Sequence, residues 1–179
     1  AFCELKANFF RLILTKAELL ALTPADFDFT THTLRINKSY QRLNREDVIT
    51  PPKTFKSNRF IKMPQFICDE MQDYMEMLYG LKEDERIFTI SKSYLHHEMN
   101  RGSKVSGVKR IRVHDLRHSH VSLLINMGFT VLAIADRMGH ESIDITYRYA
   151  HLFPSEQTQM AEQLDIERME KLNGEKSGQ

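Results

Sequence analysis

Hydrophobic positions recur at helical spacing through residues 112–151, and glycines divide this stretch into segments. An apolar stripe with the spacing i, i+4, i+7, i+8, i+11 predicts a first helix that ends at Gly128. A second helix is expected between Thr130 and Gly139, and Ser142 is a suitable cap for a third, short one. The first stripe consists of Leu116, His120, Leu123, Leu124 and Met127, and the third helix carries Tyr147 and Tyr149.

The rest of the chain combines helical and alternating patterns. Helical periodicity predicts helices over 4–22, 65–79, 91–101 and 155–172, whereas 102–112 is typical of a flexible loop. Alternation of apolar and polar residues predicts three short strands. We therefore expect an α+β fold that is mainly helical, with a small three-stranded antiparallel sheet. The strands are expected over 33–40, 46–52 and 58–64, with residues 53–57 as a polar hairpin tip between the last two.

The length of 179 residues is sufficient for one domain with a hydrophobic core. We expect residues 1–172 to form this domain and residues 173–179 to be a disordered tail. Because the chain lacks an apolar run of about 18 residues, we expect no transmembrane helix. The N-terminal segment also lacks the basic region and cleavage site of a signal peptide. Cys3 and Cys68 are too few for a disulfide framework, fit a reducing compartment, and are most simply two buried apolar side chains.

Charge is unevenly distributed, although the formal net charge is only +1. Lys and Arg dominate residues 38–62 and 101–117, whereas Asp and Glu dominate 69–85 and 155–179. This segregation fits a basic face for nucleic acid and an acidic back, but solvated helix faces explain it equally well. Likewise, the basic segment 102–112 suits either contact with phosphates or a plain linker.

Polar residues that carry chemistry gather where the predicted helices begin and end. His114 and Arg117 share one helix face, His140 follows Gly139, and Tyr149 comes nine residues after His140. Such groups at helix ends suit a site built around an anion. The segments HDLRH, GH and YRYAH together resemble the C-terminal half of the tyrosine recombinase, or phage integrase, family. The family signature is H-x-x-R, then Gly-His, then a nucleophilic tyrosine nine residues after that histidine, and this chain matches all of it.

The resemblance implies a role for each matching residue. Tyr149 would attack a DNA phosphorus to form a 3′-phosphotyrosine link, and His114 would take the proton of its hydroxyl. Arg117 would clamp the phosphate oxygens with its planar fork, and His140 would hydrogen-bond one of them. Lys53 lies in the context PKTFKSNR, which is similar to the family's P-K-T-x-x-S-x-R, and would protonate the leaving 5′ oxygen.

Some of these assignments have simpler structural alternatives. Taken alone, Lys53 reads as a surface lysine, and Lys56 is its rival on the same loop. Periodicity alone would leave either Tyr147 or Tyr149 as a core residue, and only the nine-residue spacing favours Tyr149. His118 and His120 follow the motif: His118 has no assigned role in it, and His120, on the apolar face, is more simply a core histidine.

One part of the family pattern is missing. The family carries a segment similar to T-G-x-R-x-x-E-L-L-x-L, whose arginine is the first of two that grip the phosphate. This chain reads LTKAELLAL, so a Gly-x-Arg tripeptide is absent between Thr15 and Lys16. Either the three residues are missing from the sequence as determined, or the protein has lost them. Loss of three residues from the entrance of a helix would rotate Glu18 and the leucines after it by most of a turn and spoil the core stripe, which favours the first explanation. Arg11 lies on the wrong side of the gap.

The resemblance implies a site-specific recombinase or integrase, of the kind found on phages and integrative elements, that needs no metal or other cofactor. The implied partners are double-stranded DNA and other protomers, four on DNA, with the helix 155–172 packing either on a neighbour or on its own domain. We expect the family's N-terminal DNA-clamping domain to be absent from this chain, and the location to be the bacterial cytoplasm, on DNA. The expected DNA contacts are Lys56, Arg59, Lys104, Lys109, Arg110 and Arg112.

Two other functions compete with this interpretation. His114 and His118 imitate the H-E-x-x-H helix of zinc hydrolases, although Asp115 replaces the glutamate and no third ligand has a fixed spacing. EDTA would separate the two, because phosphotyrosine chemistry should survive it. The second alternative is a recombinase fragment that binds DNA but cuts feebly or not at all, since the first arginine is missing.

Overall fold

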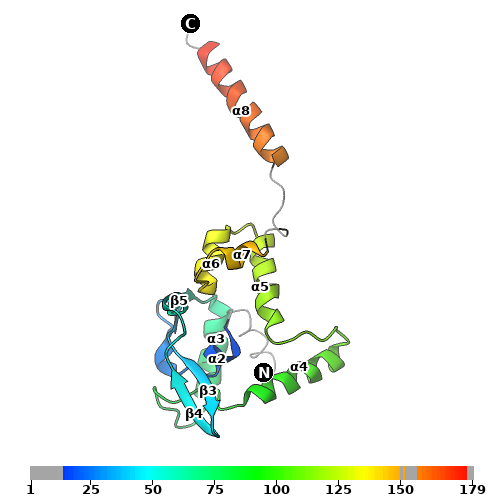
Figure 1. The fold of residues 1–179 in the computed structure, drawn as a ribbon. Helices are drawn as coiled ribbons and strands as arrows, with labels where there is room; N and C mark the ends of the chain where they lie inside the picture. Colours follow the sequence, from blue (N-terminus) through cyan, green and yellow to red (C-terminus); the bar gives the residue numbers. More distant parts are fainter. Residues whose placement is uncertain (1–13, 150, 152–156, 177–179) are drawn as a thin grey trace.

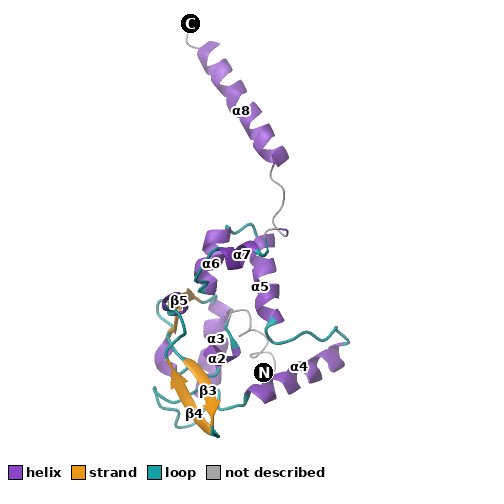
Figure 2. Ribbon diagram, viewed as in Figure 1, coloured by secondary structure: helices purple, strands orange, loops and turns teal. Residues whose placement is uncertain are grey.

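The computed structural model describes residues 14–149, 151 and 157–176, and these combine helices with short antiparallel strands (Figures 1 and 2). The strands are β1 (Phe27–Asp28), β2 (Thr33–Ile36), β3 (Ser39–Leu43), β4 (Glu46–Thr50) and β5 (Arg59–Lys62), and short 3-10 turns are η2 (Pro24–Asp26) and η3 (Phe55–Ser57). The helices are α2 (Lys16–Leu19), α3 (Gln65–Glu76), α4 (Lys92–Ser106), α5 (Asp115–Asn126), α6 (Val131–Met138), α7 (Asp144–Tyr147) and α8 (Gln157–Lys176).

The strands form two small sheets where the sequence predicts one. The first is three-stranded and antiparallel, in the order β1-β2-β5, with Leu34 opposite Ile61 in its buried face. The second is the β3–β4 hairpin, whose two-residue turn places Asn44 and Arg45 at positive φ. A type I′ hairpin turn needs positive φ at both central residues, which asparagine tolerates well. The prediction that 53–57 is a hairpin tip is therefore wrong: this segment connects β4 of one sheet to β5 of the other.

The predicted helices of the C-terminal half are confirmed at their caps. Thr130 accepts a hydrogen bond from the backbone of Ala133 at the start of α6, and Gly139 ends that helix in the left-handed conformation. At α7 the prediction is one residue off: Ser142 accepts from the backbone N–H of Asp144, but the N-cap position is Ile143, whose side chain makes no capping bond. In contrast, α4 continues past its predicted end to Ser106, so about half of the expected flexible loop 102–112 is helical. Gly102 lies inside this helix. A glycine weakens a helix interior by only about 1 kcal/mol, so it need not end the helix.

The direct junction of Thr15 and Lys16 is compatible with a packed core. Thr15 caps α2 reciprocally with Glu18, and Leu19 and Leu20 are buried. The missing tripeptide falls at the entrance of α2, between the buried Leu14 and the buried Leu19 and Leu20, and the side chains on both flanks of the junction pack in the core. The expectation that a deletion would spoil the core is therefore not supported. Of the helix expected over 4–22, residues 4–13 lie outside the described part; within 14–22 only Lys16–Leu19 is helical, so the prediction is wrong for the rest of that stretch.

The buried apolar residues form two separate clusters. The larger cluster is built around α2, the strands and α3, and it includes Val113 just before α5. The smaller cluster joins the buried face of α5 to that of α6, and Tyr149 packs against it. Helix α5 therefore begins beside one cluster and ends in the other.

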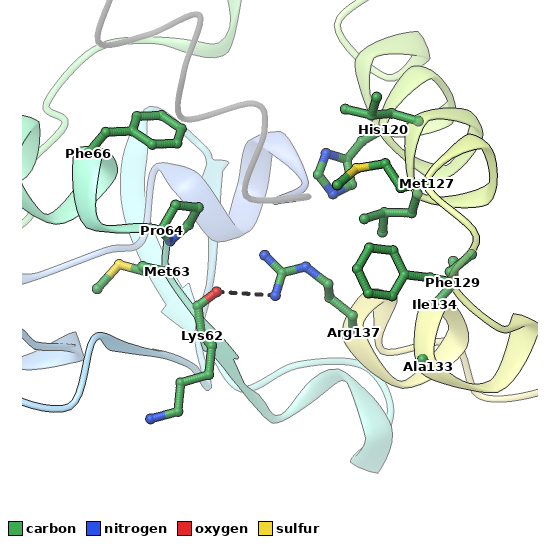
Figure 3. A pocket seen from close by; sticks show the side chains of 12 residues that line it. Lys62, Met63, Pro64, Phe66, His120, Met127, Phe129, Ala133, Ile134 and Arg137 are labelled. Atoms are coloured by element: carbon green, nitrogen blue, oxygen red, sulfur yellow. Dashed lines mark hydrogen bonds between the residues drawn. The ribbon is translucent and has the colours of Figure 1, made fainter.

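An apolar groove of about 600 Å³ lies between these two regions (Figure 3). Met63, Pro64 and Phe66 line one side, and residues of α5, α6 and the connection between them, including Met127 and Phe129, line the other. His120, expected to be a core histidine, is half-buried and lines this groove. Two guanidinium–carbonyl bonds join the sides: Arg137 Nη1 donates to the Lys62 carbonyl at 3.1 Å, and Arg59 Nε donates to the Arg137 carbonyl at 3.2 Å.

Helix α8 extends away from the other elements (Figure 1). It ends at Lys176, beyond the predicted end of the helix at 172, so part of the expected disordered tail is helical. Its described side chains are exposed, and they include Met160, Leu164, Ile166 and Met169. Within the described ranges, no helix combines the length and apolar character needed to cross a bilayer.

Candidate active site

The start of α5 is fixed by a local ion pair. Asp115 accepts hydrogen bonds from the backbone of Arg112 at 2.8 Å and from its guanidinium at 2.8 Å. These bonds lower the pKa of the Asp115 carboxyl to about 2. The contact holds the chain that leads into His114, which occupies the N-cap position of α5 with helical backbone angles. Arg112, expected to contact DNA, remains exposed beside Asp115.

Arg117 lies one turn into α5 and reaches the end of α6. Its Nη2 donates to the carbonyl of Met138 at 2.5 Å, directly before Gly139. Burial lowers the pKa of the Arg117 guanidinium to about 10, with the charge of Arg59 acting in the same direction and Glu18 opposing it. The group still carries its charge at neutral pH. The structure thus brings the predicted phosphate clamp beside the predicted Gly-His pair.

The turn after α6 places His140 next to the loop that carries Lys53. Gly139 has a φ of +66°, and a Cβ there would lie 2.9 Å from the Lys56 carbonyl oxygen and 2.9 Å from Cδ of Arg59. Only glycine fits this close approach. The backbone N–H of His140 then donates to the carbonyl of Ala135 at 3.0 Å, which fixes the backbone of this turn against the end of α6.

The His140 side chain is held in its neutral form. Its Nδ1 lies 2.8 Å from the hydroxyl of Thr146, which is fully buried. Burial lowers the pKa of His140 to about 4, and the charges of Arg117 and Arg59 add to this effect. When the Thr146 hydroxyl donates to Nδ1, Nε2 carries the proton and becomes a hydrogen-bond donor.

Tyr149 lies just beyond α7, and its hydroxyl contacts Nδ1 of His118. The ring of His118 in turn meets that of His114 edge to face, with 4.9 Å between centroids. Burial raises the pKa of the Tyr149 phenol, so it is protonated at neutral pH. A reaction that uses this oxygen as nucleophile needs a proton acceptor, and His118 is in contact with it. Sequence reasoning gave His118 no role, although its spacing of four residues from His114 on one helix face was visible.

Lys53 is exposed in the loop between β4 and β5, where the hydroxyls of Thr54 and Ser57 lie 2.8 Å apart. Arg59 differs from its prediction as a DNA contact. Its side chain is buried, and Nη1 donates to Oε1 of Glu18 at 2.7 Å. A guanidinium held inside in this way does not face a duplex. The remaining predicted DNA contacts are exposed: Lys56, Lys104, Lys109 and Arg110.

The histidine pair on α5 finds no third metal ligand in the described part of the chain. No group of three His, Cys, Asp or Glu side chains there is arranged to hold a metal ion. His114 and His118 meet instead as an aromatic pair. The geometry thus gives no support to the zinc hydrolase interpretation.

Comparison with known proteins agrees with this geometry. The sequence profile described as the phage integrase family matches residues 10–156. The ICEBs1 integrase of Bacillus subtilis (strain 168) is 32% identical over 162 residues, which cover 83% of this chain and 44% of that relative. A putative prophage phiRv2 integrase of Mycobacterium tuberculosis is 25% identical over 148 residues, 78% of this chain and 40% of its own. This chain therefore spans less than half the length of either relative.

Two solved structures share the fold. The Tn1549 transposon integrase in complex with transposon right end DNA superposes with a TM-score of 0.70 at 19% identity, over 93% of this chain and 58% of its own. The catalytic domain of bacteriophage HP1 integrase has a TM-score of 0.60 at 19% identity, over 88% of this chain and 79% of its own. These likenesses confirm the expected fold, which is mainly helical with a small antiparallel sheet. The profile match over most of the chain, together with the histidine, arginine and tyrosine motif, shows that this chain belongs to the phage integrase family of tyrosine recombinases.

Proposed function

We propose that this chain is the catalytic part of a site-specific recombinase that cuts and rejoins double-stranded DNA through a 3′-phosphotyrosine intermediate. The observation that carries the proposal is the contact of the Tyr149 hydroxyl with His118, beside His114 on the same helix. Arg117 of α5, whose guanidinium reaches the end of α6 next to His140, supplies positive charge for binding a phosphate. Family membership supports the chemistry, and the Tn1549 integrase, solved with DNA, supports a duplex as the substrate.

The proposed reaction balances without a metal. The Tyr149 oxygen attacks phosphorus, the bond from phosphorus to the 5′ oxygen breaks, and the phenol proton passes to an imidazole. Arg117 and His140 stabilise the charge that develops on the non-bridging oxygens. Lys53 donates a proton to the departing 5′ oxygen. Attack by the 5′-hydroxyl of another strand on the phosphotyrosine reverses these steps and joins new partners.

The contacts modify the proton acceptor that the family resemblance implies. His118, rather than His114, touches the Tyr149 hydroxyl, which supports His118 as the first acceptor. His114 lies against the ring of His118 and faces the recess shared with Arg117, where it would interact with the phosphate. Both histidines keep a place in the proposed site: His118 takes the acceptor role first given to His114, and His114 takes a contact with the phosphate.

The proposed partners are DNA and further copies of the recombinase, assembled as a tetramer on DNA in the bacterial cytoplasm. Helix α8 is the proposed connector, because its exposed apolar residues, such as Leu164 and Met169, contact none of the described core. The apolar groove between α3 and α5–α6 is a suitable receiver on a neighbour. Crosslinking on DNA should give tetramers for the full chain and lose them for a chain that ends at residue 156.

A pool of nicked suicide duplexes with randomised sequence tests the chemistry, because the target site is unknown. The wild-type chain should form a covalent adduct that survives a denaturing gel, and Tyr149→Phe should form none. Tyr147→Phe is the matched control, since Tyr147 is exposed on α7 and should react as the wild type. An adduct that persists in Tyr149→Phe refutes the assignment.

The missing first arginine favours a second candidate, a recombinase fragment that binds DNA without cutting it. In that case gel shifts with the same pool would show salt-sensitive binding, but the denaturing gel would show no adduct for any variant.

A further inference from the structure

A second recess adjoins the candidate active site. It has a volume of about 260 Å³ and lies where the start of α2 meets the starts of α4 and α5. Four of its lining residues are basic: Lys16, Lys92, His114 and Arg117. None of the other lining residues is acidic. Since one water occupies about 30 Å³, the recess has room for a tetrahedral anion with an attached group.

The Lys16 side chain is oriented by a contact with α4. Its Nζ lies 3.1 Å from Nε2 of His96 on α4. An ammonium only donates, so this ring nitrogen accepts, and His96 is neutral. Burial lowers the pKa of His96, and the charge of Lys16 acts in the same direction. An ammonium has three N–H groups, so two remain for another acceptor.

Glu18, the acidic residue nearest to Lys16 along the sequence, has both carboxylate oxygens engaged elsewhere. Glu18 Oε1 accepts from Arg59 at 2.7 Å, and Oε2 accepts from the backbone of Thr15 at 2.7 Å. Both carboxylate oxygens are therefore committed to bonds that hold the start of α2 against β5. The described lining of the recess therefore contributes basic side chains and no carboxylate.

We propose that Lys16 is a phosphate-binding residue and that, together with Arg117, it holds the scissile phosphate in place of the arginine that this chain lacks. The inference rests on the proposed function for the identity of the anion, although the basic recess exists without it. Lysine acts as a point charge without a planar fork, so it would neutralise the phosphate but orient it less strictly than arginine. The chain would then be a slower recombinase, not an inactive one.

Inorganic phosphate is the first probe, titrated into the full chain by calorimetry. Lys16→Ala should weaken phosphate binding about tenfold, as expected for the loss of one charge-assisted hydrogen bond. Lys16→Arg should retain it. Lys82→Ala is the matched control, because Lys82 is exposed and lies outside the recess, and it should bind as the wild type. If Lys16→Ala unfolds, Lys16→Gln keeps most of the side chain and should show the same loss.

The suicide duplex pool is the second arm, and it separates the two proposals. Loss of phosphate binding in Lys16→Ala, with no adduct from the wild type, would keep the anion site but refute the recombinase chemistry. Equal adduct yields from the wild type and Lys16→Ala would overturn the role of Lys16 while the proposed function stands. Absence of measurable phosphate binding by the wild type, or equal binding by Lys16→Ala, would also overturn it.

Discussion

Alanine at Gly139 should disrupt the site more than alanine at any open left-handed glycine. Gly139 (φ +66°) and Gly128 (φ +84°) end successive helices, and an L-residue pays about 1–2 kcal/mol in this conformation at either place. At Gly128 an added Cβ meets nothing within 4 Å. At Gly139 it would lie 2.9 Å from both the Lys56 carbonyl oxygen and Cδ of Arg59.

These neighbours cannot give way easily. The Lys56 oxygen is backbone, and Arg59 is buried and held by Glu18. Overpacking by one methyl group typically costs a further 1–3 kcal/mol or so. We therefore expect the free energy of unfolding to fall by about 1–2 kcal/mol in Gly128→Ala and by about 2–5 kcal/mol in Gly139→Ala.

Urea denaturation of the two variants and the wild type measures this difference, and the suicide duplex pool measures its effect on chemistry. Gly139→Ala should also lose most adduct formation, because the strain is relieved by moving the loop of Lys53 away from His140. Gly128→Ala should cut almost as the wild type does. Equal stability losses in the two variants, or full adduct formation by Gly139→Ala, would refute the close packing of this loop on the turn after α6.

Four further results are expected. Glu18→Gln leaves the buried Arg59 without its carboxylate and should lower the free energy of unfolding by about 3–5 kcal/mol in urea, whereas Glu85→Gln, in the exposed ion pair with Lys82, should cost about 1 kcal/mol or less. The folded-state pKa of His140, about 4, lies below its ordinary value of 6.5, so the stability it contributes is present above pH 6.5 and lost as the pH falls toward 4. Between pH 7 and pH 5 the wild type should therefore lose more stability than His140→Gln. EDTA should leave adduct formation unchanged, and inhibition would revive the metal alternative. Duplex binding should be strongly salt-dependent, and Lys109→Ala should lower the salt slope by about 1, which an unchanged slope would contradict.

Features that depend on local chemistry were predictable from the sequence. Helix α6 begins at Thr130 and ends at Gly139 because a side-chain cap and a left-handed glycine act within a few residues. The spacing of Tyr149 from His140 identified the tyrosine that packs beside α5, and the alternative, Tyr147, is exposed.

Features that depend on partners distant in the sequence could not be predicted from it. Alternation marks a strand but does not name its neighbour, so the pairing of β2 with β5 and the separate β3–β4 hairpin could not be derived. Arg59 looked like a surface residue because its partner, Glu18, lies 41 residues away in the sequence. The contact of His118 with Tyr149 likewise requires α5 and α7 to be placed in space. The pattern HDLRH resembled a metal motif because periodicity places both histidines on one face without showing what faces them.

The division of the apolar core has a mechanical consequence. The groups proposed for one reaction are shared between its two parts: Lys16 and Lys53 belong to the side of the sheets, whereas His140 and Tyr149 belong to the side of α6. Helix α5 connects the two parts. If they moved apart at the apolar groove, two guanidinium–carbonyl bonds would break, while the buried residues of each cluster would remain packed. A phosphate bound by residues of both parts would hold them together. Binding of the duplex would then complete the catalytic arrangement, and its release would leave the two parts less firmly joined.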